Sequence, residues 1–198
     1  MKESKLKPKK KLEGMRVMIL GIDGYLGWTL ALRLGSLGCE VSGIDNQNRR
    51  RWVAERRSHS IVPIEDMENR LQAAREVLGI EIAYRELDLL DRSAMQDFIQ
   101  EVQPEAIVHY AECPSAPYSM LDAEHAIEVQ RNNVLGTLGL LFIMRDVVPE
   151  ASLVKLGTMG EYGTPLSGRP IFEGVFPPEA TLHWDDREWS LGGELIPR

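Results

Sequence analysis

The chain alternates short apolar runs with longer stretches in which apolar residues recur every three or four positions. The apolar runs predict buried β-strands at 17–20, 40–44, 81–87, 106–111 and 152–158. The stretches between them predict helices at 28–38, 65–79, 91–104 and 122–147, and Asp91 is the expected N-cap of the third. Strands that alternate with helices pair in parallel through right-handed crossovers. The predicted fold class is therefore α/β, with a doubly wound parallel sheet.

The pattern changes from Pro165 onward, where Pro and Gly are frequent and no period is sustained. Such a stretch predicts loop with one short hairpin. The predicted organisation is a basic disordered tail at 1–14, a nucleotide-binding domain at 15–165 and an irregular tail at 166–198. An irregular tail of that length at the end of a compact domain indicates that further chain normally follows it.

Three glycines join the first strand to the first helix. Gly21, Gly24 and Gly27 have the spacing G-x-x-G-x-x-G, which is found both in phosphate-binding loops and in tight turns. The second strand ends in Asp45, 18 residues beyond Gly27, where a ribose-binding carboxylate is expected. This context favours a phosphate-binding loop, so the predicted fold is Rossmann-like.

The carboxyl ends of the predicted strands carry polar side chains, and ligands bind at this edge of an open parallel sheet. Asp45 can accept hydrogen bonds from both adenosine ribose hydroxyls and would repel a 2′-phosphate, so NAD is the predicted cofactor. Thr158 could hydrogen-bond a substrate oxygen or satisfy the backbone. The residues that follow the strands are Asp45, Asn46, Asp88, Leu89, Ala111, Glu112, Cys113, Thr158 and Glu161.

An arginine cluster offers a counter-argument, because guanidinium groups suit a 2′-phosphate. It comprises the arginines at 49, 50, 51, 56 and 57. A solvated helix face is the favoured interpretation of the cluster, with Arg49 left open as a cofactor contact.

Composition limits the classes of function. The longest apolar stretch, 134–144, is too short to cross a bilayer, and two cysteines without a secretory signal favour a cytoplasmic protein. Residues 1–11 hold six lysines, which leaves the remainder with a formal charge of −12 and argues against nucleic acid as a partner. No metal site is predicted, because the four histidines have no ligand spacing. His109 lies on an apolar strand, where a core histidine with satisfied hydrogen bonds is the expected interpretation.

Several motifs together resemble the extended short-chain dehydrogenase/reductase superfamily, in its UDP-sulfoquinovose synthase-like branch. They are the glycine loop, DN at 45–46, ECPSAPYSM at 112–120, QRNNVLGT at 130–137 and LVKLGTMGEYGTP at 153–165. The resemblance implies NAD-dependent enzymes that oxidise UDP-glucose at C4, eliminate water and add sulfite. Cys113 stands where the family often has Gln, so the use of sulfite is left open.

The resemblance also implies roles for particular residues. Gly21, Gly24, Tyr25, Leu26 and Gly27 would hold the pyrophosphate. Asp45, Asn46 and Arg49 would contact the adenosine, with Asp88 and Leu89 at the adenine and Ala111 at the same rim. Thr158 matches the family's catalytic hydroxyl, Glu161 is an acid/base candidate, and Asn133 matches an asparagine that organises the site.

Short-chain dehydrogenases also use a Tyr-x-x-x-Lys pair, which this chain lacks. We therefore expect the N-terminal, NAD-binding part of such an enzyme, truncated before that pair and before its substrate domain. The alternative is a non-catalytic NAD-binding module that pairs with a partner chain. A UDP-sugar, and a homo-oligomer or partner chain, are the expected partners.

Overall fold

The computed structural model describes residues 12–157, 179–184 and 187–190. The chain divides into two compact units, Met1–Lys155 and Leu156–Arg198. Thr158 and Glu161, the two catalytic candidates, lie outside the described residues, as does the predicted domain boundary at 165.

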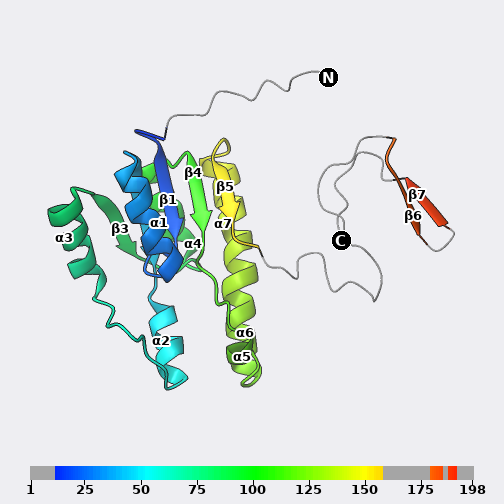
Figure 1. The fold of residues 1–198 in the computed structure, drawn as a ribbon, viewed down its shortest axis with the longest axis horizontal. Coiled ribbons are helices and arrows are strands. Elements are labelled where there is room, and N and C mark those ends of the chain that lie inside the picture. Colours follow the sequence, from blue (N-terminus) through cyan, green and yellow to red (C-terminus); the bar gives the residue numbers. More distant parts are fainter. Residues whose placement is uncertain (1–11, 158–178, 185–186, 191–198) are drawn as a thin grey trace. The chain divides into compact units, whose positions relative to one another are not determined.

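The first unit is built on a parallel five-stranded sheet with the order β3-β2-β1-β4-β5 (Figure 1). The strands are β1 (Arg16–Leu20), β2 (Glu40–Asp45), β3 (Ile82–Glu86), β4 (Ala106–His109) and β5 (Ser152–Lys155). The strands β2 and β3 lie on one side of β1, and β4 and β5 lie on the other. The doubly wound fold predicted from the sequence is therefore confirmed. The order reverses between β1 and β4, and ligands bind at such a point in open α/β sheets.

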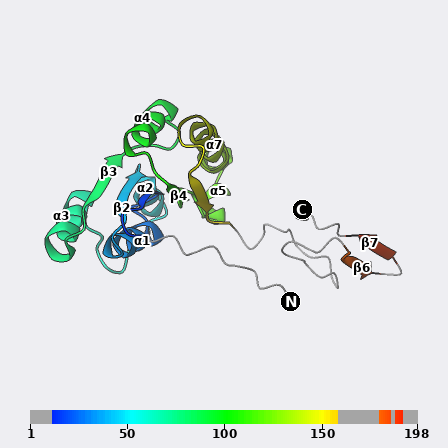
Figure 2. The ribbon, with the colours of Figure 1, turned by 90° about the horizontal axis from the view of Figure 1, so that it is seen from above.

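Helices cover both faces of this sheet (Figure 2). On one face, α1 (Tyr25–Ser36) and α3 (Met67–Leu78) pack against Val17 and Ile19. On the other, α4 (Arg92–Val102) and α7 (Gly136–Val147) pack against Met18 and Leu20. Side chains alternate along a strand, so the apolar residues Val17 to Leu20 of β1 contribute to both layers.

Aspartates fix the starts of several helices by accepting a hydrogen bond from a backbone N–H in the first turn. Asp91 accepts from Ala94 at 3.1 Å, which confirms its predicted role as an N-cap. Asp66 and Asp122 cap α3 and α6 (Ala123–Gln130) in the same way. Two further helices, α2 (Asn48–Glu55) and α5 (Ala116–Ser119), are not distinguished by the sequence pattern.

The long helix predicted over 122–147 is helical throughout but not uniform. Between α6 and α7 lies a π-helical turn, η1 (Arg131–Leu135). Such turns are rare and occur frequently at functional sites, because the extra residue changes the direction of the side chains within it.

The second unit contains an antiparallel hairpin of β6 (Thr181–Trp184) and β7 (Arg187–Ser190), which confirms the hairpin predicted for this segment. Among the residues that the structure describes, no helix has the length and apolar character needed to span a membrane.

Candidate functional site

The glycine loop between β1 and α1 leaves no room for side chains. Gly21 has φ +83°, and a Cβ there would lie 2.8 Å from the backbone nitrogen of Ala111. A Cβ on Gly27 would overlap the carbonyl oxygen of Gly21 and lie 2.8 Å from Cα of Ile22. The loop and the start of α1 are therefore in direct backbone contact, and Ala111, two residues after β4, borders the loop.

The first turn of α1 presents its backbone N–H groups at this loop. Gly24 is the N-cap and no side chain caps the helix within the described residues. Tyr25 is 87% exposed and Leu26 is 47% exposed. An uncapped helix start with a close-packed glycine loop is suited to bind a phosphate group, through its N–H donors and the positive end of its dipole.

Asp45, at the end of β2, lies beside the glycine loop. Its Oδ2 accepts a hydrogen bond from the backbone N–H of Asp23 at 2.9 Å, and its Oδ1 accepts one from Gln47 at 2.7 Å. Burial raises the pKa of Asp45, while these two backbone donors act in the opposite direction. The carboxylate is thus fixed in orientation, and each oxygen retains a second lone pair for a ligand.

Asn46 and Asp88 meet beside Asp45. The amide of Asn46 donates to Oδ2 of Asp88 at 2.9 Å, and Oδ1 of Asp88 accepts from the backbone of Leu90 at 2.8 Å. These contacts bring the ends of β2 and β3 together. The side chain of Leu89 is buried against Gly136, so only its backbone is available to a ligand.

The loop after β4 is held by two asparagines of η1. Asn133 accepts from the backbone N–H of Cys113 at 2.9 Å and donates to its carbonyl at 3.1 Å. Asn132, which the sequence analysis missed, donates to the carbonyl of Ala111 at 3.1 Å. The Asn-Asn pair in the sequence is the signal that could have identified both. Cys113 is buried and its pKa is raised by burial, as expected for an inert thiol.

Four of the five arginines in the cluster are exposed, as a solvated face predicts, but Arg50 is half-buried. Arg50 forms a bidentate ion pair with Asp23, and Arg51 pairs with Glu55 and Glu128. Arg49 is exposed, and its charge lowers the pKa of the Cys113 thiol against the larger effect of burial. Asp23 was not among the residues predicted for the site, although a carboxylate inside a glycine loop needs cationic neighbours.

His109 is completely buried and only half satisfied, contrary to the expectation of a satisfied core histidine. The hydroxyl of Thr137 donates to the carbonyl of Asn133, so it must accept from Nε2 of His109 at 3.0 Å. Nδ1 has no hydrogen-bond partner among the described residues. Burial lowers the pKa of His109 to about 4, so the ring is neutral at neutral pH.

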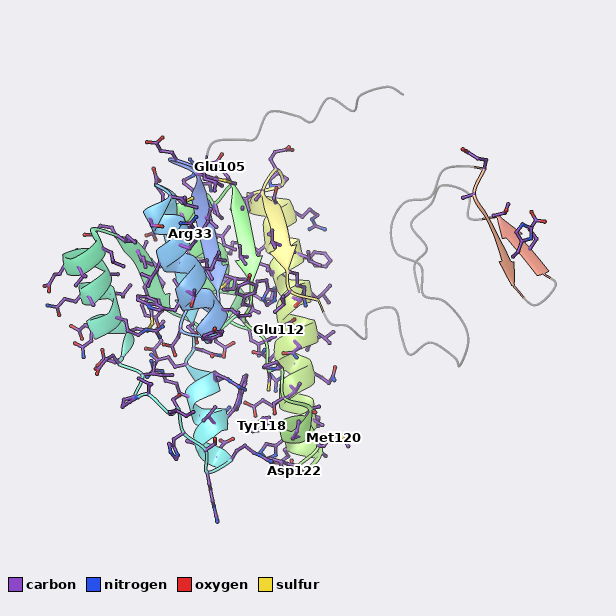
Figure 3. The ribbon with its side chains drawn as sticks, viewed as in Figure 1. Arg33, Glu105, Glu112, Tyr118, Met120 and Asp122 are labelled. Carbon is purple, nitrogen blue, oxygen red and sulfur yellow. The ribbon has the colours of Figure 1, made fainter. Side chains whose placement is uncertain are left out.

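Side chains from α2, α5 and α6 meet around Tyr118 (Figure 3). Its hydroxyl lies 2.9 Å from Oε2 of Glu55 and 3.0 Å from Oε2 of Glu128, and the indole of Trp52 also bonds Glu128. Burial and the two carboxylates raise the pKa of Tyr118, so the phenol keeps its proton. The SAPYSM motif thereby holds α2 against α5 and α6.

At the carboxyl edge of the sheet, the Glu112 carboxylate forms an ion pair with Lys155 at 2.5 Å.

The strand order, the glycine loop and the acidic side chain at the end of β2 define a Rossmann-like α/β protein. More narrowly, the chain belongs to the NAD dependent epimerase/dehydratase family, which it matches over residues 17–181.

Two curated relatives are UDP-sulfoquinovose synthases, as the motifs indicated. The chain is 45% identical over 151 residues to that of Sulfolobus acidocaldarius and 40% identical over 150 residues to the chloroplastic one of Spinacia oleracea. Each alignment covers 76% of this chain, but the chain spans only 38% and 31% of the two relatives. The cytoplasmic location expected from the sequence stays a prediction.

Solved structures confirm the fold. The UDP-glucose 4-epimerase of Bifidobacterium longum, in complex with NAD+ and UDP, aligns with TM-score 0.62 and 21% identity over 84% of this chain and 44% of its own. The epimerase of Stenotrophomonas maltophila, with bound NAD and formylated UDP-arabinopyranose, aligns with TM-score 0.59 and 22% identity over 79% of this chain and 40% of its own.

Proposed function

We propose that this chain binds NAD as the N-terminal part of a UDP-sulfoquinovose synthase-like nucleotide-sugar enzyme. The observation that carries the proposal is the hydrogen bond from Asp23 N–H to Asp45 Oδ2, which joins the glycine loop to the carboxylate at 2.9 Å. The two halves of an adenosine diphosphate site are thereby adjacent. Gly21 and Gly27, where a Cβ would strike backbone, make the cradle fit a pyrophosphate.

The residues of the site would share the work of binding. The backbone of Gly24, Tyr25 and Leu26 would bind the pyrophosphate, and the Asp45 carboxylate would accept from the adenosine ribose hydroxyls. Asn46 and Asp88, bonded to each other, would border the adenine. Asn133 would keep the loop after β4 clear of the cofactor by holding Cys113 on both its N–H and its carbonyl.

NAD, when bound, would supply a hydride acceptor and donor for the C4 carbon of a UDP-sugar. By resemblance the substrate is UDP-glucose, with elimination and sulfite addition following oxidation, and Thr158 and Glu161 would act at the substrate. The family's Tyr-x-x-x-Lys pair is not in this sequence. We propose cofactor binding for this chain, which spans 38% and 31% of the lengths of the two synthases.

A calorimetric titration of NAD+ into the 198-residue chain tests the cofactor assignment. We expect saturable binding that Asp45→Ala weakens by about tenfold or more, because charge-assisted hydrogen bonds to the ribose contribute about 1.5 to 3 kcal/mol. Asp97→Ala, an exposed aspartate on α4, is the matched control and should bind like wild type. Unchanged affinity in a folded Asp45→Ala variant would refute the ribose assignment.

The second candidate, a non-catalytic module that pairs with a partner chain, is favoured by one observation. Leu138, Leu141 and Phe142 form an apolar stripe on α7, and each is 45% to 48% exposed within the described part of the chain. The two candidates share the NAD site and differ in assembly. Light scattering of the purified chain separates them, since a monomer at micromolar concentration counts against the module.

A further inference from the structure

Asp23 lies inside the glycine loop and joins three segments of the first unit. Its side chain is only 5% exposed. Arg50, on α2, donates to both carboxylate oxygens at 2.7 and 2.8 Å. Arg70, on α3, donates to Oδ1 at 2.5 Å and to the Asp23 carbonyl at 3.0 Å, while its guanidinium stacks on Trp28 with 4.2 Å to the ring centroid.

The guanidinium of Arg50 has almost no donor left for another ligand. Of its five N–H groups, two are directed at the Asp23 carboxylate. Two more donate to backbone carbonyls, to Ile64 at 3.2 Å and to Glu65 at 2.7 Å. This arginine, which by its type and position could bind a 2′-phosphate, is therefore already occupied.

Asp23 also acts on Asp45. Its backbone N–H orients the Asp45 carboxylate, and its side chain pairs with the Arg50 guanidinium. The charges of Asp23 and Arg50 both influence the pKa of Asp45, so the three groups lie within electrostatic range of one another. The carboxylates of Asp23 and Asp45 and the guanidinium groups of Arg50 and Arg70 together carry no net formal charge. Without the Asp23 charge, the cluster would carry a net positive charge beside the ribose position.

We propose that Asp23 is a positioning residue that sets the preference for NAD over NADP, by holding Arg50 in an ion pair away from the 2′-position of the adenosine. Asp45 rejects the 2′-phosphate directly, and Asp23 removes the cation that would otherwise attract it. This inference rests on the proposed binding of NAD. It also accounts for an arginine-rich segment, typical of NADP sites, directly after an aspartate typical of NAD sites.

The test is a double-mutant cycle on cofactor preference. NAD+ and NADP+ are titrated into wild type, Asp23→Asn, Asp45→Asn and the double variant, and the ratio of the two dissociation constants is compared. An amide holds a guanidinium about half as strongly as a carboxylate does. We expect Asp23→Asn to shift the ratio toward NADP by about tenfold, the effect of one released charge-assisted hydrogen bond. Asp97→Asn, with the same charge change at an exposed site, should leave the ratio unchanged.

A second substitution distinguishes this role from a general loosening of the loop. If Arg50 is the group released, Asp23→Asn combined with Arg50→Gln should lose the gain in NADP affinity. Persistence of the gain without Arg50 would overturn the proposal. Loosening alone would weaken both cofactors together and leave the ratio constant, which would also overturn it.

Arg70→Gln keeps the proposal testable if Asp23→Asn does not fold. Removing Arg70 leaves Asp23 to Arg50 alone, so the preference for NAD should increase, and an unchanged or reduced preference counts against the proposal. The wild-type titration distinguishes a failure of the proposed NAD binding from a failure of the role proposed for Asp23. If wild type binds neither cofactor, the proposed function fails as well; if it binds NAD and the variants leave the ratio unmoved, only the role of Asp23 fails.

Discussion

Substitution of Gly27 tests whether close backbone packing at the glycine loop is essential. In Gly27→Ala, the new Cβ would overlap the carbonyl oxygen of Gly21 and lie 2.8 Å from Cα of Ile22. Both neighbours are backbone atoms in a buried turn, so they cannot rotate away. Overpacking of this kind costs about 3 kcal/mol, and the better helix propensity of Ala returns about 1 kcal/mol. The expected net loss of stability is about 2 kcal/mol.

Differential scanning calorimetry measures the consequence directly. For a chain of this length, a loss of about 2 kcal/mol lowers Tm by about 4 to 8 °C. The matched control is Gly139→Ala on α7, where the new Cβ would meet Arg92 Cγ at 3.6 Å, an ordinary contact. Propensity alone should then raise stability by up to about 1 kcal/mol. Opposite signs for two Gly→Ala changes in helices support the packing argument, and a Tm for Gly27→Ala equal to wild type or higher refutes it.

Two further predictions concern the interior near the site. Because burial lowers the pKa of His109 to about 4, the unfolded chain binds a proton below pH 6.5 that the folded chain does not. The free energy of unfolding should therefore fall as pH decreases from 6.5 toward 4. In urea unfolding, His109→Gln should lose less stability than wild type between pH 7 and 4.5. Equal losses in the two proteins would exclude His109 as the cause. Asn133→Ala removes both side-chain hydrogen bonds to the Cys113 backbone, so labelling of Cys113 by a thiol reagent should accelerate by about tenfold. Cys39, which bonds the Leu12 carbonyl, is the internal reference, and parallel acceleration of both thiols would indicate global unfolding instead.

Much of the site could be predicted because local sequence determines local backbone. Apolar runs specify strands, and the glycines at 21 and 27 are required by backbone contacts in the turn itself. Asp45 is the last residue of its strand, so the topology of a parallel sheet places it at the rim with the glycine loop. The N-cap Asp91 was equally local.

The predictions that differed from the structure depend on partners distant in sequence. The arginine cluster was interpreted as a solvated face, which holds for its four exposed members, but Arg50 pairs with Asp23, 27 residues away in the sequence. His109 was expected to be satisfied, and only the position of Thr137, on a helix that follows a π-turn, shows which ring nitrogen is bonded.

The sequence alone determined the five strands of the sheet, the longer helices between them, the glycine turn and the acidic end of β2, because each depends on residues close together in the chain. Only the tertiary structure decided which charges neutralise one another and which donors remain for a ligand. Ion pairs and buried hydrogen bonds form between side chains that packing brings together. The hydrophobic pattern of the sequence does not indicate which distant side chains will be in contact. The state of Arg50, committed to Asp23 and to two carbonyls, is the clearest instance.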